Sequence, residues 1–277
     1  SIVVLGGGVI GMEFVSLFST LGVDVTVVEM LPKILGPMDE ELSTELQQAF
    51  EKRKVKFHLS TKVTAVRDGR VIAEHEGEQL EIPFDKLLVS VGRRAVTDGL
   101  GLETVGVELQ RGAIVVDEHL ETSVPGIYAV GDVNGVSMLA HTAAREGQVA
   151  VHHITDYPDA MSYRAIPGIV YTDPEIASVG QTEQELRTTG VDYQVHRVPM
   201  SLSGRFVIEN EQGNGFCKLL TDSEGVILGA HMLGNGSSEI LVPAIMAVEQ
   251  RMTLAELARI VFPHPTVSEI VRVAALS

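Results

Sequence analysis

Apolar residues change their spacing repeatedly near the start of the chain. The uninterrupted apolar run Ile2–Leu5 is typical of a strand buried on both faces of a parallel sheet. A helix-like spacing then continues to about Leu21, where Gly22 breaks it. A second apolar run, Val25–Val28, ends at Glu29. This order predicts a strand, a helix and a second strand, the repeating unit of an α/β fold.

Three glycines join the first strand to the helix in the pattern G-x-G-x-x-G, with Gly6, Gly8 and Gly11 at the fixed positions. Gly6 permits a tight turn, Gly8 lets the backbone approach a pyrophosphate, and Gly11 lets the helix pack closely on its strand. The helix N-terminus offers free N–H groups to the phosphates. Glu29 can accept hydrogen bonds from ribose hydroxyls and repels a 2′-phosphate, so NAD is favoured over NADP. A glycine-rich turn in an ordinary α/β domain is the alternative.

The next part of the chain extends the α/β pattern. An amphipathic helix is expected over residues 39–54. Short strands are expected at 55–58, 63–67, 71–75, 79–82, 86–91, 113–116 and 127–130, and a helix at 141–154. We interpret residues 1–92 as a Rossmann-like NAD-binding domain and residues 93–160 as a central segment.

The last third of the chain has the rhythm of an antiparallel sheet with helices between strands. Strands are expected at 168–171, 177–180, 193–199, 215–220 and 226–233, and helices at 182–190, 237–250 and 266–275, with another from Thr253. Thr182 with Glu185, and Thr253 with Glu256, have the spacing of capping boxes. Residues 161–277 are therefore predicted to form an α+β interface domain that follows the α/β domain.

Composition narrows the functional classes. The net charge of −16 argues against a nucleic-acid partner, and no apolar stretch of the 277 residues approaches the length of a membrane span. Cys217 is the only cysteine, so no internal disulfide is possible, which suits a cytoplasmic protein. No residue cluster has metal-ligand spacing, so we expect no metal site. Cys217 is interpreted as structural, and His152 with His153 as a solvated helix face.

Two further groups of residues have the chemistry of a site. Asp132 follows the predicted strand 127–130, at the end where α/β folds bind ligands, although an aspartate there also caps turns. His264 lies between two prolines, and Glu269 lies in the first turn of the final predicted helix. A carboxylate there can bind one imidazole nitrogen and make the other a general base. A surface histidine beside a capping glutamate is the alternative.

Together these motifs resemble the pyridine nucleotide–disulfide oxidoreductases over essentially all 277 residues. Besides the glycine turn, the resemblance rests on segments 89–94, 127–132, 138–141, 166–175 and 264–269. Glu29 and the sequence Met-Leu-Ala-His at 138–141 favour the dihydrolipoamide dehydrogenase branch. The resemblance implies that electrons pass from dihydrolipoamide to a redox disulfide, then to FAD, and then to NAD.

The resemblance also implies residue roles and partners. His264 would take a proton from the substrate dithiol in the active site of the partner subunit of a homodimer, and Glu269 would orient it. A 2-oxoacid dehydrogenase or glycine cleavage complex is an implied larger partner. The implied FAD contacts are Asp132, Met138, Leu139, Ala140 and His141, and the implied NAD contacts are Gly6, Gly7, Gly8, Val9, Ile10, Gly11, Met12, Glu13, Glu29, Val63 and Gly92.

The chain departs from the family in one serious respect. The family has an N-terminal FAD domain with its own glycine fingerprint and a cysteine pair. The 277 residues contain neither this second fingerprint nor a cysteine pair. We therefore expect the NAD-binding and dimerisation portion of a dihydrolipoamide dehydrogenase, inactive as this chain alone and holding FAD poorly. The alternatives are a non-catalytic nucleotide-binding dimer module, or another disulfide oxidoreductase such as glutathione reductase. Glutathione reductase uses NADPH and would need arginines near Glu29.

Overall fold

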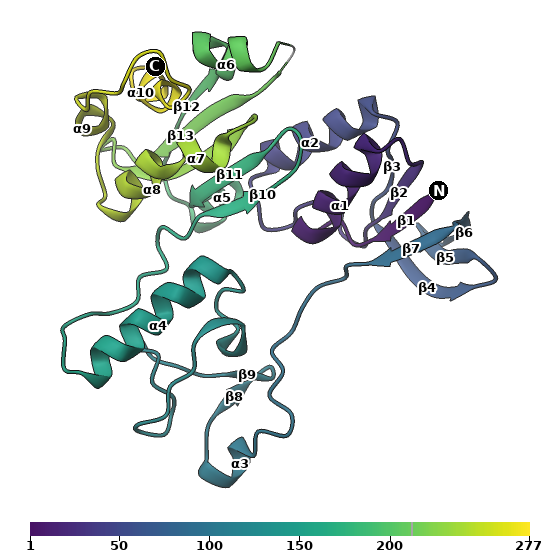
Figure 1. Ribbon diagram of the computed structural model, residues 1–277, viewed down its shortest axis with the longest axis horizontal. Helices are drawn as coiled ribbons and strands as arrows, with labels where there is room; N and C mark the ends of the chain where they lie inside the picture. The colour runs from purple at the N-terminus through teal and green to yellow at the C-terminus, as the bar shows by residue number, and fades with distance from the viewer. Residues whose placement is uncertain (212) are drawn as a thin grey trace. The chain divides into compact units, whose positions relative to one another are not determined.

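The computed structural model describes residues 1–211 and 213–277, which form two compact units. One unit combines residues 1–91 with residues 165–277, and the other contains residues 92–164 (Figure 1). The mixed α/β architecture, with a parallel sheet followed by an antiparallel one, confirms the predicted fold class. Among the described residues, no helix has both the length and the apolar character needed to cross a membrane.

The N-terminal part of the first unit is built on a parallel four-stranded sheet with strand order β3-β2-β1-β7. The predicted strand, helix and second strand are all present, as is the amphipathic helix that follows them. A separate antiparallel sheet of three strands connects β3 to β7. The elements are β1 (Ile2–Leu5), α1 (Val9–Thr20), β2 (Val25–Val28), α2 (Glu40–Lys52), β3 (Lys56–His58), β4 (Thr61–Arg67), β5 (Arg70–His75), β6 (Glu78–Pro83) and β7 (Lys86–Val89).

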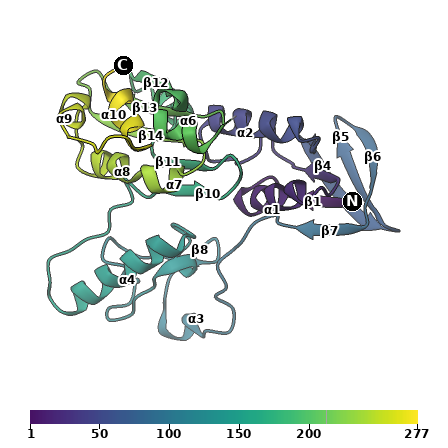
Figure 2. The same cartoon turned by 45° about the horizontal axis from the view of Figure 1, so that its top comes forward.

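Both faces of the parallel sheet are covered, which explains its uninterrupted apolar strands. From β1, Val4 packs with residues of α1 and α2, whereas Val3 and Leu5 pack with residues of the three-stranded sheet. Figure 2 shows α1 and α2 on one side of β1 and the strands β4, β5 and β6 on the other. The sheet therefore brings the carboxyl ends of β1, β2 and β7 to one edge, beside the N-terminus of α1.

The C-terminal part of the first unit contains the predicted antiparallel sheet, with strand order β10-β11-β14-β13-β12. Thr182 and Thr253 form complete capping boxes with Glu185 and Glu256, as predicted. The elements are β10 (Gly168–Val170), β11 (Ile176–Gly180), α5 (Glu183–Thr189), β12 (Gln194–Pro199), α6 (Gly204–Glu209), β13 (Phe216–Thr221), β14 (Ile227–Leu233), α7 (Ser237–Ile240), α8 (Val242–Glu249), α9 (Leu254–Ala258) and α10 (Glu269–Ala275), with a 3₁₀ turn at Met200–Leu202.

Two helix predictions in this part differ from the structure. The single helix expected over 237–250 is divided into α7 and α8. Pro243 lies in the first turn of α8, where its ring and its missing N–H are compatible only with a helix start. The final helix begins at Glu269 rather than at Thr266, and the Thr266 N–H donates to the Glu269 carboxylate in the segment before it.

The second unit has little regular structure apart from one long helix. The strand predicted at 127–130 is wrong: Tyr128 forms only an isolated bridge with Glu121. The Ala129 N–H donates to Leu120 O, so this backbone pairs with a nearby turn rather than with a sheet. The elements are α3 (Leu102–Val105), β8 (Leu109–Gln110), β9 (Ala113–Ile114), a 3₁₀ turn at Gly131–Asn134 and α4 (Ala140–Ile154).

Candidate functional site

The glycine turn after β1 is so tightly packed that two of its residues cannot carry side chains. Gly6 has a φ of +103°, and a Cβ atom there would lie 2.3 Å from Ser90 O. A Cβ atom on Gly11 would lie 2.1 Å from Gly6 O. Because a backbone oxygen lies where each Cβ atom would be, only glycine fits at these positions.

Gly8 is a glycine for a different reason. Its φ of −73° is open to any residue, and no atom lies within 4 Å of the position its Cβ would take. The space beyond Gly8 is therefore open at the N-terminus of α1, which has no side-chain cap. N–H groups at such a helix start and the positive end of its dipole favour a phosphate. The residues present fit a dinucleotide pyrophosphate at this place.

Glu29 follows β2 and lies beside the same turn. Its Oε2 accepts the Gly7 N–H at 2.6 Å, and its Oε1 accepts the Leu31 N–H at 2.7 Å. A carboxylate has about four acceptor positions, so each oxygen retains a lone pair for a further donor such as a ribose hydroxyl. Two main-chain groups thus fix the carboxylate that the sequence pointed to.

The other residues expected around NAD occupy different environments. Met12 is fully buried in the core beneath α1, whereas Val9 is half-buried and Ile10 is exposed at the helix start. The Glu13 carboxylate accepts the Tyr171 N–H at 3.0 Å. Val63 packs into the small sheet on β4. Gly92, with a φ of +116°, lies in the second unit.

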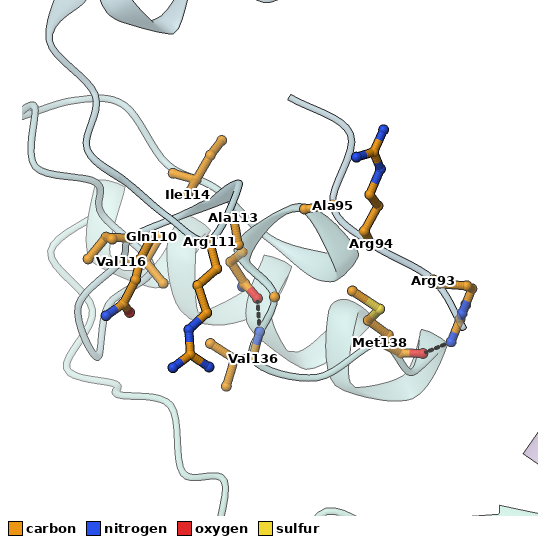
Figure 3. A pocket seen from close by; sticks show the side chains of 13 residues that line it. Arg93, Arg94, Ala95, Gln110, Arg111, Ala113, Ile114, Val116, Val136 and Met138 are labelled. Atoms are coloured by element: carbon orange, nitrogen blue, oxygen red, sulfur yellow. Dashed lines mark hydrogen bonds between the residues drawn. The ribbon is translucent and has the colours of Figure 1, made fainter. Parts of the chain in front are cut away.

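The second unit brings together the residues expected around the flavin. Arg93 donates to Met138 O at 2.7 Å (Figure 3) and to Asp132 Oδ2 at 3.3 Å, so one guanidinium joins both segments. Leu139 is the N-cap residue of α4, and Ala140 and His141 begin that helix. A cavity of about 580 Å³ adjoins this group and is lined in part by Ile114, Val116 and Val136. Arg94, at its rim, points away from Arg93 and Met138 in Figure 3.

A buried carboxylate that sequence reasoning missed supports the turn that carries Asp132. Glu146 is fully buried on α4 and accepts the Gly131 N–H at 2.5 Å, Asn134 Nδ2 at 3.0 Å and the Tyr163 hydroxyl at 2.7 Å. Burial, followed by the Glu146 carboxylate, raises the pKa of Tyr163. The sequence does contain a signal for the burial of Glu146, because this residue lies on the same face of α4 as the buried residues Thr142, Val149 and Ala150.

His264 and Glu269 form the expected pair. The imidazole Nδ1 lies 2.9 Å and 3.1 Å from the two carboxylate oxygens of Glu269. Because an ionised carboxylate only accepts, Nδ1 is the donor, and the neutral ring carries its lone pair on Nε2. The Thr266 N–H, and after it His264, lower the pKa of Glu269. The imidazole is 81% exposed, so a base is presented at the surface of this chain.

A second charged cluster is filled by an ammonium group. Asp39, Glu41 and Glu183 are the carboxylates that, among the described residues, lie close enough together to hold a metal ion. Lys218 Nζ already lies between them, at 2.7, 3.0 and 2.6 Å. Lys218 and Asp39 are fully buried, and the cluster joins α2 to α5 and β13. It is therefore a structural ion-pair network between the two halves of the first unit.

The remaining candidates are structural. Cys217 is fully buried, and burial raises the pKa of its thiol to about 12, so it stays a neutral thiol. His152 and His153 on α4 are half-buried rather than solvated, and each is held by a neighbour. His152 Nδ1 lies 2.7 Å from Asp159, and His153 Nδ1 lies 2.8 Å from the Tyr128 hydroxyl.

Comparison with known proteins assigns the chain to a class of nucleotide-dependent redox enzymes. Residues 1–147 match the family model described as pyridine nucleotide-disulphide oxidoreductase. Residues 166–275 match the dimerisation domain of the same family. The chain therefore belongs to the pyridine nucleotide-disulphide oxidoreductases.

Individual relatives agree with this assignment. A mitochondrial dihydrolipoyl dehydrogenase of Dictyostelium discoideum is 41% identical over 99% of this chain and 58% of its own length. The crystal structure of LpdA from Mycobacterium tuberculosis superimposes with a TM-score of 0.89 at 32% identity, covering 99% of this chain and 61% of that one. The HOCl-induced flavoprotein disulfide reductase RclA from Escherichia coli gives 0.87 at 28% identity, covering 99% and 64%. The chain thus spans about three fifths of the length of these relatives.

Removing the imidazole should raise the pKa of Glu269 only part of the way to its usual value. In His264→Ala the side-chain partner is lost, but the Thr266 N–H, the larger cause of the lowering, remains. A lowered carboxyl pKa adds stability above the usual pKa of the group, and this stability is lost as the pH falls through the lowered value. The measurement is a ¹³C NMR titration of the Glu269 carboxyl in both proteins.

Glu256 is the matched control in that titration. Its pKa is lowered by the N–H and hydroxyl of Thr253, with no histidine involved, and should not change in His264→Ala. An identical Glu269 titration in the two proteins would mean that the His264–Glu269 contact is absent in solution.

Proposed function

We propose that the first unit binds NAD through the glycine turn and Glu29. The observation that carries this proposal is Gly8, which nothing in the protein requires to be a glycine and which faces open space at the start of α1. Glu29 is held by Gly7 of the same turn, so the phosphate-binding and ribose-binding groups form one structure. Gly6, Gly8, Gly11 and Glu29 are the residues to which we assign these contacts.

We further propose that the second unit contributes to an FAD site of the whole protein. Asp132 and the 138–141 segment are joined by Arg93, and Glu146 fixes the turn that carries Asp132. When bound, FAD would carry electrons between a dithiol and a nicotinamide. Asp132 fits a hydroxyl ligand, and the uncapped start of α4 fits a carbonyl or anionic group.

The function that these sites support best is that of a dihydrolipoamide dehydrogenase, which oxidises dihydrolipoamide and reduces NAD. In this proposal His264 Nε2 accepts a proton from a substrate thiol, and Glu269 holds the ring in the tautomer that leaves Nε2 free. Association with a 2-oxoacid dehydrogenase or glycine cleavage complex, and a cytoplasmic location, remain predictions from the sequence.

Glu29 should set the preference for NAD over NADP. Replacement by Ala or Gln removes the negative charge and at least one acceptor, so NAD affinity should fall about tenfold or more, as expected for a hydrogen bond to a charged group. NADP binding should weaken less, because the repulsion of its 2′-phosphate is relieved at the same time. Calorimetry with both nucleotides measures the two affinities.

Glu51→Ala provides the control for the loss of one negative charge in the same domain, because Glu51 is exposed on α2. It should leave both affinities within a factor of about two. A folded, unsubstituted chain that binds neither nucleotide would contradict the proposed site.

The 277 residues alone should not oxidise dihydrolipoamide. They contain one cysteine, which is buried, and thiol–disulfide exchange needs an accessible cysteine pair. We propose that this pair belongs to polypeptide outside these residues. NADH formation by purified chain with added FAD, dihydrolipoamide and NAD should equal that of Cys217→Ser. Turnover well above that variant would contradict the proposal.

The dimerisation domain should form a homodimer through its exposed apolar helix face. Val242 and Met246 lie one turn apart on α8 and are 50% and 61% exposed. Met246→Glu would place an unpaired carboxylate in the interface and should yield monomer in sedimentation analysis. Val66→Glu, at an exposed apolar residue of β4, should remain dimeric. A monomeric unsubstituted chain at high concentration would contradict this interface.

A further inference from the structure

The peptide group between Gly6 and Gly7 is unusual because both flanking residues are glycines. A peptide flanked by glycines meets little steric resistance to rotation about its long axis, since neither residue has a Cβ atom. Such a flip would turn the Gly7 N–H and the Gly6 C=O to opposite sides of the turn. The orientation of the phosphate-binding turn therefore depends on what holds these two polar groups.

The N–H group of this peptide is held by the carboxylate of Glu29. The Gly7 N–H donates to Glu29 Oε2 at 2.6 Å, and the other carboxylate oxygen is fixed by the Leu31 N–H. The residues on either side are held as well. The Gly6 N–H donates to Val28 O, and Gly7 O accepts the Leu35 N–H at 2.8 Å.

The C=O group of this peptide lies near the hydroxyl of Ser90, the residue that directly follows β7. Ser90 Oγ lies 2.9 Å from Leu5 O and 3.3 Å from Gly6 O, so its proton is shared between consecutive carbonyls. The Ser90 N–H also donates to Leu5 O, at 2.8 Å, which fixes the serine against the end of β1. The hydroxyl lies 2.8 Å from where a Cβ on Gly11 would be, so it also borders the start of α1.

We propose that Ser90 is a positioning residue for the dinucleotide site. Ser90 holds the Gly6 C=O and Glu29 holds the Gly7 N–H, and together they fix the turn that faces the pyrophosphate. This proposal rests on the proposed NAD site and adds a residue that touches no ligand. It predicts a loss of affinity confined to ligands that carry a pyrophosphate, because adenosine has no phosphate and would use only Glu29 among the residues assigned to the site.

The test compares ADP-ribose and adenosine as ligands of the 277-residue chain. In Ser90→Ala, affinity for ADP-ribose should fall about threefold to tenfold, the range for one neutral hydrogen bond. Affinity for adenosine, followed by NMR shift changes, should stay within a factor of about two. Ser90→Thr keeps the hydroxyl and should restore ADP-ribose affinity. Ser19→Ala removes a half-buried hydroxyl at the far end of α1 and should change neither affinity.

A second measurement needs no ligand. In Ser90→Ala the Gly7 N–H should exchange with solvent faster than in the unsubstituted chain, while amides of the α1 interior exchange at unchanged rates. Unchanged ADP-ribose affinity with unchanged Gly7 exchange would overturn this role of Ser90, and so would an equal loss for both ligands. Failure of the unsubstituted chain to bind ADP-ribose would instead overturn the NAD site, whereas the Gly7 exchange rate would still decide whether Ser90 holds the peptide.

Discussion

The contact between Gly11 and the Gly6 carbonyl is the constraint on which residues 1–91, the proposed nucleotide-binding half of the first unit, depend. With a Cβ position only 2.1 Å from that oxygen, α1 can start directly against the end of β1 only if residue 11 has no side chain. The close start points the first N–H groups of α1 at the open space beyond Gly8. It also leaves Gly7 within reach of Glu29 and Gly6 within reach of Ser90, so three strands meet at one turn.

Buried charge plays a comparable role where the nucleotide-binding half meets the dimerisation half. Lys218 would be costly to bury alone, but three carboxylates surround its ammonium group. Burial on its own raises the pKa of Asp39, yet the nearby His231 and Lys218 lower it overall, so Asp39 remains an ionised N-cap of α2. The network therefore fixes the N-terminus of α2, and with it the loop that carries Leu35 to the Gly7 carbonyl.

The sequence predicted those parts of the molecule whose causes are local. The glycine turn between the first strand and its helix, the second strand and the capping boxes depend on residues within a few positions of each other, and the structure contains all of them. Ser90, Glu146 and Lys218 were missed because their partners lie far away along the chain or on other elements. The strand expected at 127–130 failed for a related reason: its apolar pattern is correct, but strand formation also requires a pairing neighbour.

The His264–Glu269 pair shows how local and distant causes combine in one site. Its orientation is local, because the Thr266 N–H fixes the carboxylate at the start of α10 and the carboxylate then fixes the imidazole. Its chemistry is not local, because an imidazole that is 81% exposed has no low-dielectric surroundings and no reacting thiol within this chain. For the proposed role of His264 as a base, another surface would therefore have to cover the imidazole. In the proposed homodimer, association through the exposed apolar face of α8 would complete the environment in which this histidine acts.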